Sequence, residues 1–166
     1  AGGGGETLRG DVVFQSNGHA VQRTEKMTGL GHDLHGLGHR ARLLVIDNGD
    51  YGTRLAAMAR ALGISHAVLE GGWAKPIDLA VLESTLANAE PRISHVYVVH
   101  HETSSGLLNP LAPIVEVCRR HAVRVLLDAM SSFACLATPV GTGGVDAVVS
   151  SSNKCVQGMA GIGIIV

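Results

Sequence analysis

Short apolar runs alternate with segments of helical spacing from Leu43 onward. The runs LLVID, SHAVLE, HVYVVH, VRVLLD, DAVVS and GIGIIV are rich in aliphatic residues and are typical of buried strands. Between them lie TRLAAMARALG, DLAVLESTLANA and a segment from Asn109-Pro110 to about His121, each with apolar residues at helical spacing. Continuous apolar strands that alternate with amphipathic helices predict an α/β fold, in which helices flank both faces of a mostly parallel sheet.

Local signals mark the ends of the expected helices. Asp78, the first residue of DLAVLESTLANA, suits an N-cap, a position that aspartate favours. Gly63 follows TRLAAMARAL and suits a C-cap. Pro110 fits the first helical position, where its missing N–H costs nothing.

The first 42 residues differ in character from the rest. Residues 1–10 contain four consecutive glycines and predict no regular structure. The run DVVFQSNGHAV predicts a short strand that enters a polar turn at Ser16–His19. Repeated glycines argue against a stable helix in residues 22–42. We therefore expect a poorly defined N-terminal segment over 1–42 and a folded domain over 43–166.

Polar clusters follow four of the expected strands: Asn48–Tyr51, Glu102–Ser105, Asp128–Ser132 and Ser150–Lys154. Ligands of such sheets bind beyond the carboxyl ends of the strands, so we expect all four clusters at one edge. Lys154 stands alone in an otherwise apolar and glycine-rich stretch. A buried amine is costly unless it is paired or neutralised, which indicates that this lysine does not stay a free amine.

The four clusters together offer the groups that pyridoxal phosphate requires. Lys154 offers an amine for the cofactor's aldehyde, and Asp128 offers a carboxylate for its pyridine nitrogen. Thr103 and Ser105 offer hydroxyl groups, and Tyr51 offers a flat ring for stacking. The carboxylate matters most, because it keeps the ring nitrogen protonated and the ring electron-withdrawing.

Each of these residues also has a simpler interpretation. Lys154 alone would be a surface lysine, Asp128 a cap of the following turn, and the hydroxyls of residues 103–105 an ordinary turn. Tyr51 would be a core or surface aromatic residue. The combination of Lys154 with Asp128 favours the cofactor.

Composition narrows the class of protein. The 166 residues suit one domain, and the formal net charge of −1 argues against nucleic acid and anionic membranes as partners. No apolar run approaches the ~20 residues of a membrane-spanning helix. Three cysteines without a zinc-like pair indicate reduced thiols and a cytoplasmic location.

Histidines 32, 35 and 39 have a spacing that would put them on one helical face, where they could bind a metal ion. Glycines interrupt that helix, and we expect no metal site.

The runs HHETSSGLLNPL, LLDAMSSF and SSSNKCVQGMAGIGIIV resemble the class V, fold type I aminotransferases, and the resemblance continues over residues 43–166. It implies the large-domain portion of a pyridoxal-phosphate enzyme. It implies that Lys154 carries the cofactor and shuttles protons, and that Asp128 pairs with the pyridine nitrogen. It also implies that Thr103 lies near the phenolate oxygen, Tyr51 against the ring and Asn153 near the phosphate.

The resemblance is weaker before Leu43. QSNGHAV is similar to the family's phosphate-binding turn, with Gly18 and His19 at matching positions. Residues 22–42 depart from the family, where a helix should follow that turn. The chain has no initiating methionine and stops within GIGIIV, so we expect a fragment without the family's C-terminal domain. That domain supplies a substrate-binding arginine, and the chain alone is expected to be incomplete.

The resemblance implies amino transfer from 2-aminoethylphosphonate to pyruvate, which gives phosphonoacetaldehyde and alanine, in a homodimer. Two alternatives remain. One is a class V aminotransferase of the alanine or serine–glyoxylate or serine–pyruvate type, which shares the cofactor residues. The other is a truncated copy without catalytic activity.

Overall fold

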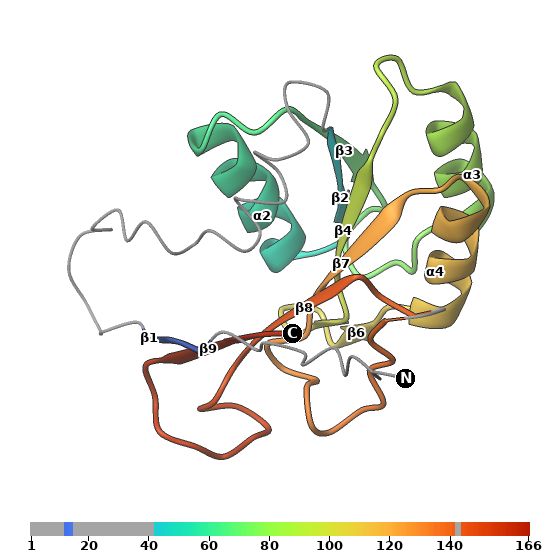
Figure 1. Ribbon diagram of the computed structural model, residues 1–166. Coiled ribbons are helices and arrows are strands. Elements are labelled where there is room, and N and C mark those ends of the chain that lie inside the picture. Colours follow the sequence, from blue (N-terminus) through green and yellow to red (C-terminus); the bar gives the residue numbers. More distant parts are fainter. Residues whose placement is uncertain (1–11, 15–41, 142–143) are drawn as a thin grey trace, which may run out of the picture.

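The apolar runs of the sequence form one sheet with helices on both faces (Figure 1). The computed structural model describes residues 12–14, 42–141 and 144–166. In this part of the chain, seven strands form the sheet in the order β1-β9-β8-β7-β4-β2-β3. Their bounds are β1 Val12–Phe14, β2 Leu43–Asp47, β3 His66–Glu70, β4 His95–Val99, β7 Arg124–Asp128, β8 Ala147–Ser151 and β9 Ile162–Ile165.

The strands from β8 to β3 are all parallel, and only β9 and β1 pair antiparallel. The predicted α/β class with a mostly parallel sheet is therefore confirmed. The run GIGIIV was expected to be a buried strand, and this is wrong. Each residue of β9 is only partly buried, because β9 lies outside the helix-covered centre and pairs with β1 on one side and β8 on the other.

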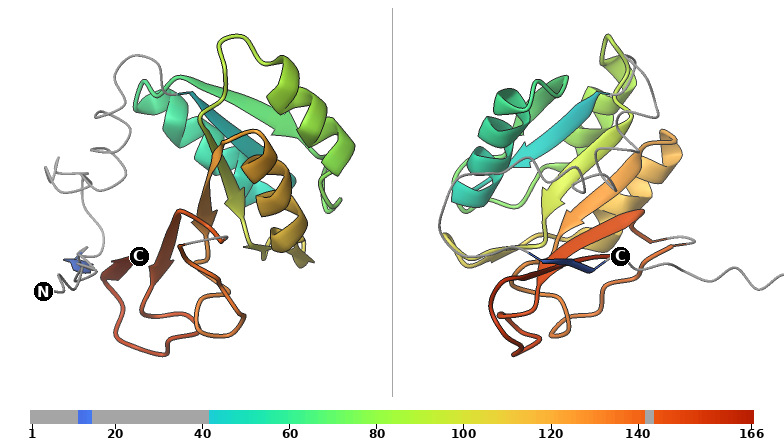
Figure 2. Two further views of the ribbon diagram at one scale, coloured as in Figure 1. Left: turned by 45° about the vertical axis from the view of Figure 1, so that its right-hand side comes forward. Right: turned by 60° about the vertical axis from the view of Figure 1, so that its left-hand side comes forward.

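Helices cover the two faces of the sheet unequally. Helix α2 (Asp50–Ala61) lies on one face, and α3 (Leu79–Asn88) and α4 (Leu111–Arg120) lie together on the other, as the two views of Figure 2 show. Successive side chains of β2 point to opposite faces of the sheet. Leu44 and Ile46 join the larger core under α3 and α4, whereas Leu43 and Val45 join the smaller core under α2.

The signals at Asp78, Gly63 and Pro110 agree with the helix ends to within one residue, whereas α2 begins at Asp50 and not at the predicted Thr53. Asp78 is the N-cap of α3, and its side chain accepts from the N–H groups of Ala80 and Val81. Gly63 follows the C-cap of α2 with a positive φ of 68°, a conformation that suits glycine. Pro110 is the N-cap of α4, and not its first helical residue as predicted.

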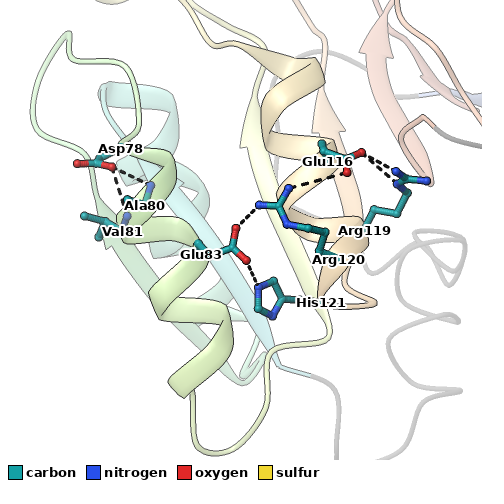
Figure 3. A network of polar contacts seen from close by, with 8 residues as sticks. All are labelled: Asp78, Ala80, Val81, Glu83, Glu116, Arg119, Arg120 and His121. Carbon is teal, nitrogen blue, oxygen red and sulfur yellow. Dashed lines mark hydrogen bonds and ion pairs between the residues drawn. The ribbon is translucent and has the colours of Figure 1, made fainter.

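Charged side chains connect α3 and α4 on their outer surface (Figure 3). Glu83 of α3 accepts from Arg120 and contacts His121 Nε2 at 2.7 Å. The hydrogen bond from Arg120, followed by that of His121, lowers the pKa of Glu83. Arg120 is exposed, and Glu83 and His121 are partly exposed. Solvent screens these charges, so the apolar contacts beneath contribute more to helix packing. Among the described helices, none has the length and apolarity to cross a bilayer.

Candidate active site

The carboxyl ends of four neighbouring strands meet at one edge of the sheet. Strands β8, β7, β4 and β2 lie side by side in that order and run parallel. The four predicted polar clusters follow them, one reaching the edge through a small hairpin of β5 (His101–Glu102) and β6 (Leu107–Leu108). The expectation that these clusters share one edge is confirmed, and we call this edge, with its four clusters, the polar rim.

Glu102 fixes the N-terminus of α2 at the polar rim. Its carboxylate is fully buried and accepts from the backbone N–H groups of Tyr51 and Gly52, at 3.1 and 3.2 Å. Ser104 donates to the same carboxylate and accepts from the N–H of Asp50 at 3.0 Å. A carboxylate is also favoured here by the helix dipole. Glu102 therefore sets the position from which Tyr51 extends.

Sequence reasoning placed Glu102 and Ser104 in a polar cluster of the site but did not predict that they hold the N-terminus of α2. A signal for them existed at the helix itself, because the N-cap of α2 is Gly49, which has no side chain to accept from the first N–H groups. An acceptor therefore had to come from elsewhere in the chain. A Cβ on Gly49 would lie 2.2 Å from Cγ of Glu102, so this close approach requires glycine.

Histidines connect the loop after β4 to the loop after β7. The N–H of His100 donates to the carbonyl oxygen of Asp128 at 2.8 Å, and its buried Nδ1 lies 2.9 Å from Oγ of Ser132. Ser131 donates to the carbonyl oxygen of His101 at 3.0 Å. Burial, and secondarily the charge of His101, lowers the pKa of His100, which favours a neutral ring. The backbone around Asp128 is thus held from two sides.

A second group of hydrogen bonds connects the loop after β7 to the end of β8 and to the loop that follows it. Ser150 donates to the carbonyl oxygen of Ala129 at 3.2 Å. Sγ of Cys155 lies 3.1 Å from the carbonyl oxygen of Ser131, to which it donates. Hydrogen bonds therefore run from the N-terminus of α2 to the residue that follows Lys154.

Burial opposes the charged form of Asp128 at the polar rim. Burial, and then the charge of Glu102, raises the pKa of its carboxyl group. A hydrogen bond from the N–H of Met130 at 3.0 Å and the more distant charge of Arg54 act in the opposite direction. The hydrogen bond to Met130 also fits the turn-capping interpretation, which does not exclude a second partner. A cation bound beside Asp128 would stabilise its charged form.

Lys154 does not have the buried surroundings that the sequence suggested. It is exposed, as is Asn153, because both lie in the turn that leaves β8 and not in the apolar interior. Its amine is therefore open to solvent. Thr103 is also exposed, Ser105 is half-buried, and the side chain of Tyr51 is 42% exposed.

Gly18 and His19, the predicted phosphate-binding turn, lie outside the described residues, as do histidines 32, 35 and 39.

Arg119 and Arg124 lie at the amino end of β7, away from the polar rim. A surface hollow at the amino end of β7 is lined by Arg119, Arg124 and Asp146 among others. Arg119 and Arg124 therefore do not face the polar rim. Arg54, near the start of α2, is the arginine whose charge acts on Asp128.

Sequence comparison relates the chain to one enzyme family. The model of the family described as Aminotransferase class-V matches residues 21–166. A protein of Aeromonas hydrophila named 2-aminoethylphosphonate–pyruvate transaminase is 41% identical over 93% of this chain and 39% of its own length. One of Burkholderia lata with the same activity in its name is 46% identical over 73% of this chain and 32% of its own length. The chain spans less than half the length of these curated relatives.

Solved structures agree with this relation. The ureidoglycine–glyoxylate aminotransferase of Bacillus subtilis matches with a TM-score of 0.69 and 25% identity, over 76% of this chain and 32% of its own. The pyridoxamine–pyruvate aminotransferase of Mesorhizobium loti matches with a TM-score of 0.67 and 28% identity, over the same shares. The chain therefore has the same fold as the matched portion of these two enzymes.

Proposed function

Since this chain belongs to the class V aminotransferase family, we propose that it is part of a pyridoxal-phosphate enzyme that transfers the amino group of 2-aminoethylphosphonate to pyruvate. The products are phosphonoacetaldehyde and alanine. The observation that carries the proposal is the shared edge of Asp128 and Lys154, which follow adjacent parallel strands and whose loops are hydrogen-bonded to each other. The names of the relatives at 41% and 46% identity support this substrate pair.

The chemistry of the polar rim fits the cofactor. When bound, pyridoxal phosphate supplies an aldehyde that combines with amines and a ring that withdraws electrons from the substrate. Asp128 is a carboxylate whose charge is opposed by burial and by Glu102, so a protonated ring nitrogen would be a favourable partner. Lys154 has an exposed amine that an aldehyde can reach.

Each residue of the polar rim has one proposed task. Asp128 would hold the proton of the ring nitrogen, and Nζ of Lys154 would bind the cofactor and then move the proton of the substrate's reacting carbon. Thr103 and Ser105 would donate toward the phenolate oxygen, and Tyr51 would stack on the ring.

We assign the phosphate to Asn153 together with Gly18 and His19 of the N-terminal segment. Glu102 positions Tyr51 through the N-terminus of α2 and does not touch the cofactor. We further propose that the complete protein acts in the cytoplasm, in the breakdown of phosphonates, as a homodimer.

A second candidate is amino transfer to glyoxylate from alanine or serine. It is favoured by solved structures with glyoxylate in their names, among them an alanine–glyoxylate aminotransferase of a Nostoc species at 26% identity and a TM-score of 0.68. The higher identity to the phosphonate-named relatives makes this the weaker candidate.

A single-turnover assay separates the two functions without requiring rapid turnover. The chain is loaded with pyridoxal phosphate, freed of excess cofactor and mixed with one amino donor. We expect phosphonoacetaldehyde from 2-aminoethylphosphonate, in an amount close to that of bound cofactor, and less keto product from alanine or serine. Preferential reaction of alanine or serine would support the second candidate. Reaction with none of the donors, in a chain that binds the cofactor, would support the third alternative, a truncated copy without catalytic activity.

A further inference from the structure

Two loops at the polar rim carry one cysteine each. The loop over residues 129–137 follows β7, the loop over 152–161 follows β8, and both views of Figure 2 show them next to each other. Sγ of Cys155 reaches the first loop, where it donates to the carbonyl oxygen of Ser131 at 3.1 Å. Cys135 lies on the turn that begins at the next residue, and its N–H donates to the carbonyl oxygen of Ser132 at 3.0 Å.

The thiols of Cys135 and Cys155 lie on two loops that the hydrogen bond to Ser131 joins, and both are open to reagents. A hydrogen bond between the Cys135 and Cys155 side chains is the largest of the causes that raise the pKa of Cys135. Cys135 is exposed and Cys155 is partly exposed. Cys118 is different, since it is buried in the core under α4, and burial raises its pKa to about 12. Thiolates and not thiols react with disulfides, so Cys118 serves as an unreactive internal reference.

We propose that Cys135 and Cys155 form a redox-active pair that closes to an intramolecular disulfide by exchange with a low-molecular-weight disulfide. This site is separate from the proposed amino transfer. It depends only on the contact between the two loops and not on a bound cofactor.

The exchange consists of two displacements at sulfur. One cysteine, as its thiolate, attacks the external disulfide, forms a mixed disulfide and releases one external thiolate. The second cysteine then attacks the cysteine sulfur of the mixed disulfide and displaces the other external thiolate. Two protein thiols are oxidised, one external disulfide is reduced to two thiols, and the two protons pass to the departing thiolates.

The disulfide would connect the two loops that carry the main groups of the polar rim. Cys155 follows Lys154 directly, and Cys135 lies on the loop that leaves Asp128. Oxidation would therefore restrict the motion of Lys154 relative to Asp128. In the reduced chain, hydrogen bonds such as that from Cys155 to Ser131 join the two loops.

The test uses oxidised glutathione on the reduced chain without pyridoxal phosphate. After treatment, free thiols are blocked with a maleimide and the chain is digested under conditions that preserve disulfides. We expect mass spectrometry to find the peptide of Cys135 joined to that of Cys155, no retained glutathione and an unmodified Cys118 in the folded state. A reducing agent should restore both thiols. Glutathione retained on either cysteine of the wild-type chain, or a disulfide between two chains, would overturn the proposal.

Matched variants test the second displacement. In Cys135→Ser and in Cys155→Ser the remaining cysteine has no partner, so each variant should retain one glutathione, unlike the wild type. Amide hydrogen exchange over residues 132–137 and 152–158 should be slower in the oxidised wild type than in the reduced one. Unchanged exchange would show that the disulfide does not restrain the loops. Because no cofactor is present, these results do not depend on the proposed transaminase function.

Discussion

Asp128 is held at the polar rim by groups that partly oppose its ionisation. Because burial and Glu102 raise its pKa above the ordinary 3.8, the folded chain retains a proton that the unfolded chain loses. The contribution of Asp128 to stability is therefore full below the ordinary value. It falls as the pH rises from there through the raised value in the folded state.

Asp128→Asn should remove this dependence, because an amide does not ionise. The free energy of unfolding of the wild type, minus that of the variant, should decrease as the pH rises through this window. Urea unfolding of both chains at a series of pH values, without cofactor, measures the difference. A difference that grows with pH would show that Asp128 is stabilised in its charged form by an interaction absent from our account.

Glu102 is expected to matter for stability because two backbone N–H groups of α2 depend on it. Glu102→Ala should lower the free energy of unfolding by about 1–3 kcal/mol, the usual cost of leaving buried groups without a partner. Glu102→Gln keeps an oxygen that accepts from Tyr51 and Gly52, so it should lose less. Hydrogen exchange at these two amides should accelerate in the alanine variant only. Wild-type stability of Glu102→Ala would contradict this role.

At the scale of single elements, α3 has a cap within its own sequence. Asp78→Ala should destabilise the chain by about 1 kcal/mol, because two N–H groups at the start of α3 lose their acceptor. Asp78→Asn is the matched control, since its side-chain oxygen can still accept. Thermal or urea unfolding distinguishes the two variants. Equal losses in both would mean that the negative charge, and not the hydrogen bonds, stabilises the helix.

The contrast between α3 and α2 explains which element features the sequence revealed. Asp78 is adjacent to the helix that it caps, so a local pattern was sufficient to predict it. The cap of α2 is Glu102, which is distant in the chain and reaches the helix only after the sheet has formed. The local sequence shows only that the N-cap position, Gly49, has no side chain to accept a hydrogen bond. It does not show which distant residue caps the helix instead.

At the scale of the whole molecule, periodicity predicted the main-sheet strands and the helices of residues 43–166, and the strand-end rule predicted the polar rim. The short hairpin of β5 and β6 was not predicted. Periodicity did not predict the antiparallel pairing of β9 with β8 and β1, because an apolar run has no feature that encodes the direction of the strand. Nor did it predict the exposure of Lys154. Apolar and glycine-rich neighbours along the chain do not surround a side chain that points outward from a turn.

The central claim, that Lys154 is the cofactor-binding lysine opposite Asp128, has one direct test. The chain contains three lysines, Lys26, Lys75 and Lys154. The chain is incubated with pyridoxal phosphate, treated with borohydride to make the bond to the lysine permanent, and digested for peptide mapping. Our account predicts the label on Lys154, at a level that falls in Asp128→Asn, which weakens the hold on the ring nitrogen. Label mainly on Lys75 or Lys26, or equal label on all three, would contradict it.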